Sequence, residues 1–231
     1  MDQLRHYLLL LHILTGGLAL VAGPIAMMNQ NGNNTHRLAG KIFFYSMTVV
    51  FLTSVFLSIY DNIPFLLMIG VFSYNSIALG YRALYLKKLN AGQKAQPIDW
   101  FISITTIIFN IGLIAWGINF FFLLKESFGI IGILFGSFGL STNLRAIKRY
   151  RIGYKTKNGW LFIHISGMIV GYIATTTAFL VNVVHFQPAF VLWLAPSVVF
   201  VPVIFYTISK FTKKIKSGKQ VEEMVTVTID N

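Results

Sequence analysis

The chain has no cysteine, so it can form no disulfide bond, no thiolate metal site and no iron–sulfur cluster, and it has no thiol nucleophile. Acidic residues are also few, with seven Asp and Glu against nineteen Lys and Arg. None of the seven acids lies in the middle of a long apolar stretch. They stand at or beyond the ends of such stretches: Asp2, Asp61, Asp99, Glu126, Glu222, Glu223 and Asp230.

This lack of intramembrane carboxylates argues against several classes of membrane protein. Proton- and sodium-coupled transporters usually keep carboxylates in mid-membrane, because an ion path through hydrocarbon needs a titratable or coordinating group. Intramembrane zinc hydrolases need several ligands and an acid or base for the attacking water. A retinal protein needs a lysine in the middle of a late helix, whereas Lys210 comes only at the end of the last apolar stretch.

Apolar residues are what the chain has in excess, with 55% hydrophobic residues and a mean hydropathy of +0.68. A membrane-spanning helix takes about 20 residues. Seven stretches meet that requirement: 7–28, 40–60, 64–85, 100–124, 127–146, 160–184 and 189–209. The sequence therefore predicts an all-α integral membrane protein with seven transmembrane helices, forming a single domain over residues 1–231.

The basic residues are distributed unevenly between these stretches. Seventeen of the nineteen Lys and Arg fall near or after the ends of the first, third, fifth and seventh stretches, and Arg5 and Lys125 are the exceptions. We expect the protein in the plasma (inner) membrane of the cell. Because short loops rich in Lys and Arg stay cytoplasmic, its N-terminus should lie outside and its C-terminus in the cytoplasm. Residues 210–231 are expected to form a basic and then flexible cytoplasmic tail.

The formal net charge of +12 then belongs largely to one membrane face. Such a charge often indicates nucleic-acid binding, but the apolar composition leaves little room for a soluble domain, so we expect no nucleic-acid partner. Anionic lipid head groups are the expected partners of the basic loops. The densest basic cluster is Lys213, Lys214, Lys216 and Lys219.

Histidines are the most notable polar residues in or near the predicted spans. His36 precedes the second span and His164 lies just inside the sixth, so the two form a predicted inner pair. His12 and His185 form a predicted outer pair, and His6 is expected in solvent. A bis-histidine haem would need one of these pairs. His12 and His164 differ in depth by about 15 Å, at about 1.5 Å per helical residue, so they cannot ligate one iron.

Two of the histidines each head a stripe of small residues on one helix face. The stripes are Gly16, Ala19 and Gly23 after His12, and Gly167, Gly171 and Thr175 after His164. Because the two spans run in opposite directions, the stripes could face each other. An imidazole for iron and glycines that leave room for a ring are what a haem between helices requires. On this interpretation the inner pair ligates haem b, with Arg37 and Lys41 on its propionates and Met168 as a further possible ligand.

A second interpretation needs no cofactor. Small residues at this spacing are the ordinary means by which membrane helices pack, and the fifth span has the same pattern without a histidine. Those residues are Gly129, Gly132, Gly136 and Gly139. The chain would then bind a lipid, a quinone or a partner protein, and its histidines would make structural hydrogen bonds. His36 and Arg37 could equally form an interfacial cap at the start of the second span.

Three sequence runs resemble the bacterial membrane family catalogued as DUF2306, a domain of unknown function. They are HILTGGLALVAGPIAM, HRLAGKIFFYSM and HISGMIVGYIATTTAF. The residues that carry the resemblance are His12, Gly16, Gly23, Pro24, His36, Arg37, Gly40, Tyr45, His164 and Met168. The resemblance implies a fold and a topology rather than an activity. A distant likeness to di-haem cytochromes of the b561 type is weakened by the histidine spacing, because those proteins place two histidines about four turns apart on one helix.

Overall fold

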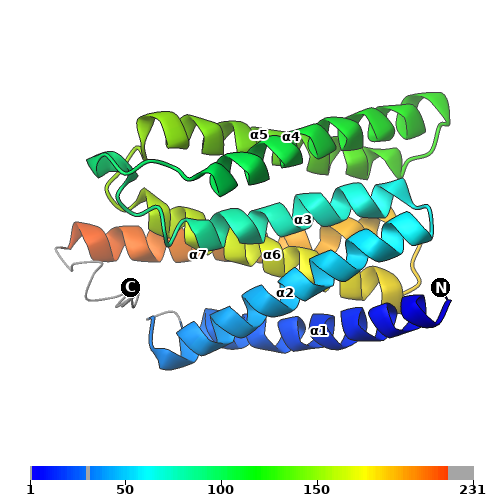
Figure 1. Ribbon diagram of the computed structural model, residues 1–231, viewed down its shortest axis with the longest axis horizontal. Helices are drawn as coiled ribbons and strands as arrows, with labels where there is room; N and C mark the ends of the chain where they lie inside the picture. The colour runs from blue at the N-terminus through cyan, green and yellow to red at the C-terminus, as the bar shows by residue number, and fades with distance from the viewer. Residues whose placement is uncertain (1, 30–31, 218–231) are drawn as a thin grey trace.

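Seven long helices lie roughly parallel to one another in the computed structural model, which describes residues 2–29 and 32–217 (Figure 1). They are α1 (Asp2–Met28), α2 (Asn34–Tyr60), α3 (Pro64–Arg82), α4 (Pro97–Ile118), α5 (Gly129–Ile152), α6 (Gly159–Val183) and α7 (Phe190–Lys216). A 3₁₀ turn, η1 (Leu89–Ala91), precedes α4, and a π-helical turn, η2 (Asn119–Leu123), extends it. All seven helices are long and apolar enough to cross a membrane, and the described residues contain no strand. The predicted all-α, seven-span architecture is confirmed.

Local sequence signals set several helix boundaries. The side chain of Asn33 caps α2 by accepting a hydrogen bond from the His36 amide, so α2 begins before the predicted residue 40. Proline starts both α3 and α4, where its missing N–H costs no intrahelical bond. Gly153 follows α5 with a φ of 80°. Helix α7 runs through Lys216, so the first part of the predicted tail is helical, and residues 218–231 lie outside the described residues.

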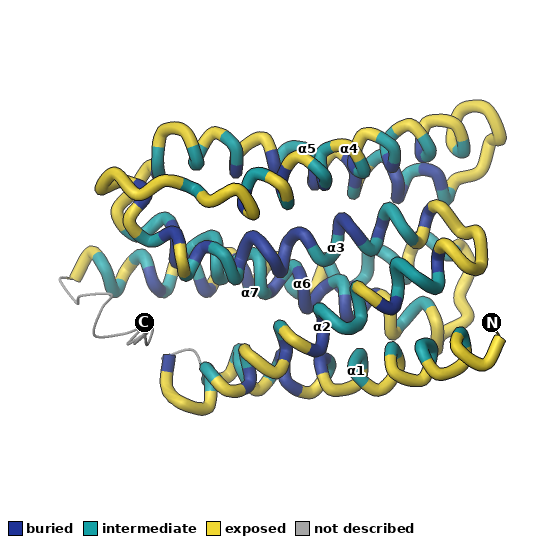
Figure 2. Tube along the Cα trace, viewed as in Figure 1, coloured by how far each residue is buried: buried dark blue, intermediate teal, exposed yellow. Residues whose placement is uncertain are grey.

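Helix α3 is the centre of the bundle (Figure 2). Half of its most apolar window is buried, compared with 17% for α1 and for α7. Its main neighbour is α6, while α1 packs chiefly on α2 and α4 on α5. The outer faces of the other helices are covered with exposed Leu, Ile, Val and Phe, as expected for surfaces that meet lipid.

Glycines allow the closest helix contacts. A Cβ added at Gly167 of α6 would lie 2.6 Å from the Ser76 carbonyl oxygen and 2.7 Å from the Gly80 Cα on α3. Five glycines make similarly close contacts between the α4–η2 segment and α5: Gly117, Gly129, Gly132, Gly136 and Gly139. The glycine pattern of the fifth span thus serves helix packing, as the second interpretation of the sequence expected.

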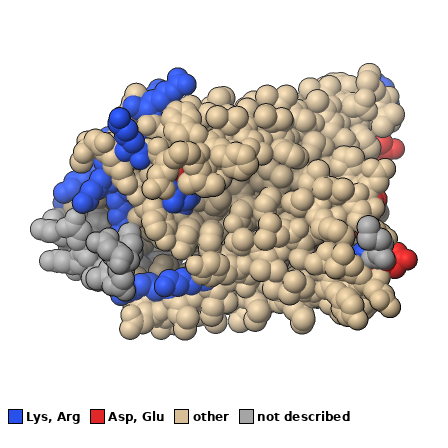
Figure 3. Space-filling model, in the orientation of Figure 1, with Lys and Arg blue, Asp and Glu red and all other residues tan. Residues whose placement is uncertain are grey.

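Nearly all Lys and Arg side chains in this view gather at one end of the bundle, which we call the basic end (Figure 3). There α1, α3, α5 and α7 end and α2, α4 and α6 begin. At the opposite end Arg5 Nε donates to Asp61 Oδ1 at 2.8 Å, and this bond lowers the pKa of the Asp61 carboxyl. The charge asymmetry is the basis for the predicted orientation, with the basic end in the cytoplasm.

The orientation can be tested with single cysteines, because the parent chain has none. We expect a membrane-impermeant maleimide to label Ser127→Cys, between α4 and α5, in sealed right-side-out vesicles, and to label Thr156→Cys, between α5 and α6, only after permeabilisation. The unmodified chain is the control for background labelling. The reverse pattern would invert the topology.

The close contact of α3 and α6 predicts a difference between two Gly→Ala changes. Gly167→Ala should lower the free energy of unfolding by about 1–3 kcal/mol, because its Cβ overpacks against α3 backbone. Gly40→Ala should leave it unchanged or raise it slightly, since nothing lies within 4 Å of the added Cβ. Thermal unfolding in detergent measures both, and equal effects would contradict the packing at Gly167.

Candidate binding site at the basic end

His36 and His164 lie side by side at the basic end. His36 is in the first turn of α2, rather than in a loop before it, and His164 is in the second turn of α6. Their ring centroids are 6.3 Å apart and the ring planes are inclined by 73°. The structure therefore brings together the two histidines of the predicted inner pair, which are far apart in the sequence.

Each of these imidazoles donates one hydrogen bond to the end of a neighbouring helix. His36 Nδ1 lies 2.9 Å from the Ala26 oxygen in the last turn of α1, and His164 Nδ1 lies 3.0 Å from the Gly80 oxygen in the last turn of α3. Carbonyls in a last turn have no partner within their own helix. Because a carbonyl only accepts, Nδ1 of each ring carries the proton and Nε2 keeps its lone pair in the neutral form.

The fixed Nδ1–H bonds prepare both rings as ligands. A metal-bound histidine almost always donates its other N–H to a carbonyl, carboxylate or water, which sets the tautomer and the ring orientation. His36 and His164 are both half-buried. The arrangement can therefore offer two imidazole nitrogens to one ligand.

Three basic residues lie on the segments that carry or adjoin the pair. Arg37 Nε donates to the Gly32 oxygen at 3.1 Å, which holds its side chain at the α1–α2 turn, and Lys41 is exposed on α2. Lys87 Nζ stands 4.7 Å from the centre of the Trp160 ring, one turn before His164 on α6. Sequence analysis missed Lys87, because only the fold brings the α3–α4 connection beside α6.

The outer histidines have different surroundings. His12 Nδ1 shares a 2.9 Å hydrogen bond with Thr53 Oγ1 and so ties α1 to α2. His185 lies exposed after the end of α6. Within residues 2–29 and 32–217, no hydrogen bond or ring contact joins the two histidines. The prediction of a second haem-ligating pair therefore has no support from their placement, since antiparallel packing leaves His12 against α2.

The small-residue stripes of α1 and α6, between which the sequence predicted a haem, pack against protein side chains and backbone. Gly167 and Gly171 face α3 rather than α1, because α6 needs small residues where it meets Ser76 and Ile77. Gly23 of α1 does approach α6, but the ring of Tyr172 occupies that contact. Met168 packs with the apolar core around the same ring. The two small-residue stripes are therefore packing surfaces and not the walls of a cofactor cavity.

No metal centre of the usual kind exists in the described part of the chain. Groups of three or more His, Cys, Asp or Glu that could hold an ion are absent from it. Structural zinc sites have four protein ligands and catalytic ones three. The two inner imidazoles alone fall short of either.

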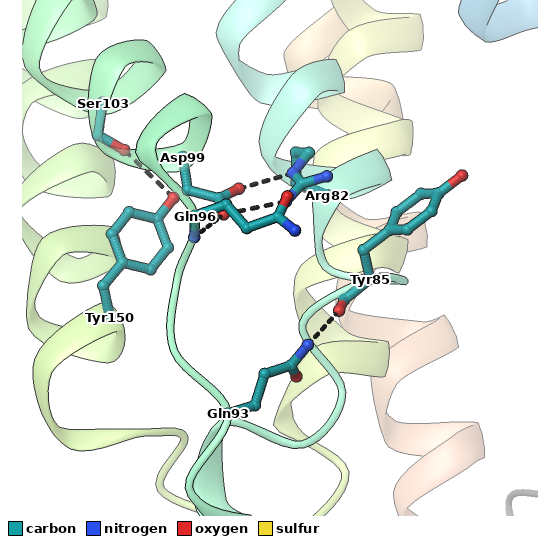
Figure 4. Close-up of polar contacts among 7 residues, drawn as sticks. All are labelled: Arg82, Tyr85, Gln93, Gln96, Asp99, Ser103 and Tyr150. Atoms are coloured by element: carbon teal, nitrogen blue, oxygen red, sulfur yellow. Dashed lines mark hydrogen bonds and ion pairs between the residues drawn. The ribbon is translucent and has the colours of Figure 1, made fainter. Parts of the chain in front are cut away.

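A buried ion pair joins α3 to α4 near this site (Figure 4). Arg82 Nε and Nη2 donate to the two Asp99 oxygens at 2.6 and 3.0 Å, and the Gln96 amide adds a third bond to Asp99 at 2.8 Å. The Asp99 side chain is fully buried, whereas that of Arg82 is 19% exposed. The sequence placed Asp99 at a helix start but missed its partner. Since both carboxylate oxygens already accept hydrogen bonds and the side chain is fully buried, the pair links α3 to the start of α4.

An apolar cluster packs around the start of α6 at the basic end. Tyr154, between α5 and α6, packs with Leu86, Leu89, Trp160 and Phe211. Burial raises the pKa of the Tyr154 phenol to about 12, so the ring remains neutral near physiological pH. This cluster supports the start of α6, from which His164 projects.

The capping role of His164 predicts a difference between two substitutions. His164→Ala should lower the free energy of unfolding by about 1–3 kcal/mol, because the Gly80 carbonyl loses its donor. His164→Asn should lower the free energy of unfolding much less, since the Asn Nδ2 can donate to the Gly80 carbonyl in place of the imidazole Nδ1. Thermal unfolding distinguishes them, and equal losses would show that the bond to Gly80 contributes little.

Comparison with known proteins identifies one family. The family model described as "Predicted membrane protein (DUF2306)" matches residues 9–144, which run from α1 into α5. His12 and His36 lie within the match and His164 lies beyond it. Searches of curated proteins and of solved structures found no match.

Proposed function

The chain belongs to the DUF2306 family of predicted membrane proteins, and we propose that this integral multi-pass protein binds b-type haem through His36 and His164 and passes electrons at the membrane. The observation that carries the proposal is the inner pair itself. Its two imidazoles meet at 6.3 Å, and each is held by an Nδ1 bond to main chain that leaves Nε2 as the free nitrogen. Two imidazoles oriented in this way would suit haem iron, which needs only axial ligands from protein.

The small number of ligands favours haem over a bare ion. A bare transition-metal ion needs further protein ligands, and the described residues supply no third His, Cys, Asp or Glu beside the pair. Haem iron already has four porphyrin nitrogens and needs only axial ligands from protein. His36 and His164 would hold such a haem, and the chemistry that it would supply is electron transfer.

Whether a haem macrocycle fits depends on the space beside His36 and His164. The interior beside His164 is filled by the contact of Gly167 with Gly80, so a macrocycle would have to lie on the side of the pair away from that contact. Cations for propionates lie at that end, with Lys41 exposed on α2 and the Lys87 Nζ beside the Trp160 ring of α6. Arg37 is bonded to the α1–α2 turn.

A second candidate function is supported by the same hydrogen bonds. Each inner histidine already caps a helix, His12 ties α1 to α2, and the glycine stripes are occupied. On this account the protein holds no cofactor, its histidines are structural, and it binds a lipid, a quinone or a partner protein. The two candidates differ in whether Nε2 of the inner pair has a ligand.

An optical spectrum of protein purified from haem-supplemented cells tests the proposal. We expect a Soret band, sharp α and β bands after dithionite reduction, and about one iron per chain. His164→Asn should lose these bands while remaining folded, because it keeps a donor for Gly80 but removes Nε2. His6→Ala should keep them.

Two results would overturn the haem proposal. One is a colourless and iron-free preparation that is nevertheless folded, which would favour the cofactor-free account. The other is an unchanged spectrum in folded His36→Asn and His164→Asn proteins, which would place the ligands elsewhere.

A further inference from the structure

The outward face of α5 carries a shallow groove near the basic end. Its volume is about 410 Å³, and its lining comes from one helix: Ser137, Leu140, Ser141, Leu144, Arg145 and Lys148. These residues lie opposite the glycines that pack on α4. Leu144 is 54% exposed, and the neighbouring Phe138 is 50% exposed. The groove therefore faces the lipid and not the bundle.

Two cations in this groove have no carboxylate partner among the described residues. Asp2, Asp61 and Glu126 lie at the opposite end of the bundle, and Asp99 is paired with Arg82 and accepts a bond from the Gln96 backbone amide. Arg145 and Lys148 stand within about two turns of the end of α5, where the hydrocarbon gives way to head groups. An uncompensated charge at that depth is costly unless it meets an anion or reaches water.

The side chain of Arg145 turns back along α5 instead of reaching away from the bilayer. Its Nη2 donates to Ser141 Oγ at 2.7 Å, one turn closer to the middle of the membrane. Ser137 stands one further turn along the same face. A guanidinium, an ammonium and two hydroxyls thus line one strip, flanked by the apolar side chains of Leu140 and Leu144.

We propose that this groove binds one anionic phospholipid in the leaflet at the basic end. The phosphate would lie against Arg145 and Lys148, and an acyl chain along Leu140 and Leu144. Guanidinium groups bind phosphate with strong, charge-assisted hydrogen bonds, and basic residues at this depth attract anionic lipid. A second copy of the chain fits less well, because a two-fold interface on this face would bring the same cations together.

Lipid titration of the purified full-length protein in a neutral detergent tests the site. We expect labelled phosphatidylglycerol to bind more tightly than labelled phosphatidylcholine. The double variant Arg145→Gln/Lys148→Gln should weaken phosphatidylglycerol binding about thirtyfold, from about 1 kcal/mol for each basic residue. The matched control, Lys155→Gln/Lys157→Gln, removes the same charge from the α5–α6 connection and should change the affinity less than threefold.

Several outcomes would overturn the proposal. These are equal affinity for the two lipids, an equal loss in the control variant, or full competition by millimolar inorganic phosphate, which would indicate a free-anion site. A concentration-dependent dimer that the double variant abolishes would assign the face to a second copy. If the double variant does not fold, Ser141→Ala provides the test, because it keeps both charges but releases Arg145. It should weaken binding severalfold, and an unchanged affinity would contradict the site.

Discussion

The contact between α3 and α6 at Gly80 and Gly167 is the constraint on which the rest of the site depends. Because neither residue has a side chain, the two backbones approach until an added Cβ would overlap the opposite helix. That approach brings the Gly80 carbonyl within 3.0 Å of His164 Nδ1. One packing contact thus fixes the ring of His164, closes the interior beside it, and leaves only the outer side of the inner pair for a ligand.

Histidine serves here as a link between helices as well as a possible ligand. A helix that ends inside a bundle has carbonyls without intrahelical partners, and lipid offers no water to satisfy them. His36 and His164 each satisfy one such carbonyl from a neighbouring helix. A residue that donates through one nitrogen and keeps a lone pair on the other can serve structure and binding together. For this reason, replacing imidazole by carboxamide separates the two roles where replacement by alanine cannot.

The charged side chains of the described residues are either paired or gathered at the ends of the bundle, with few exceptions. The one buried carboxylate that the structure describes, Asp99, receives three donors, two from Arg82 and one from the main chain. Most other Lys and Arg side chains gather at the basic end, whereas Arg145 turns back along α5 toward Ser141. That exception distinguishes the α5 groove from the basic loops, whose charges need no specific ligand.

The sequence alone determined the number and approximate positions of the seven helices, because apolar length and turn residues such as Asn33, Pro64 and Pro97 act locally. It also placed His36 and His164 near the same membrane face, since depth follows from position along a span. Only the tertiary structure decided that their rings meet, that Lys87 lies beside Trp160, and that Arg82 pairs with Asp99. It also decided that the glycine stripes of α1 and α6 are filled, because the direction a helix face takes depends on which helix packs against it. Sequence periodicity shows that α6 has a small face, but not that α3, rather than a cofactor, covers it.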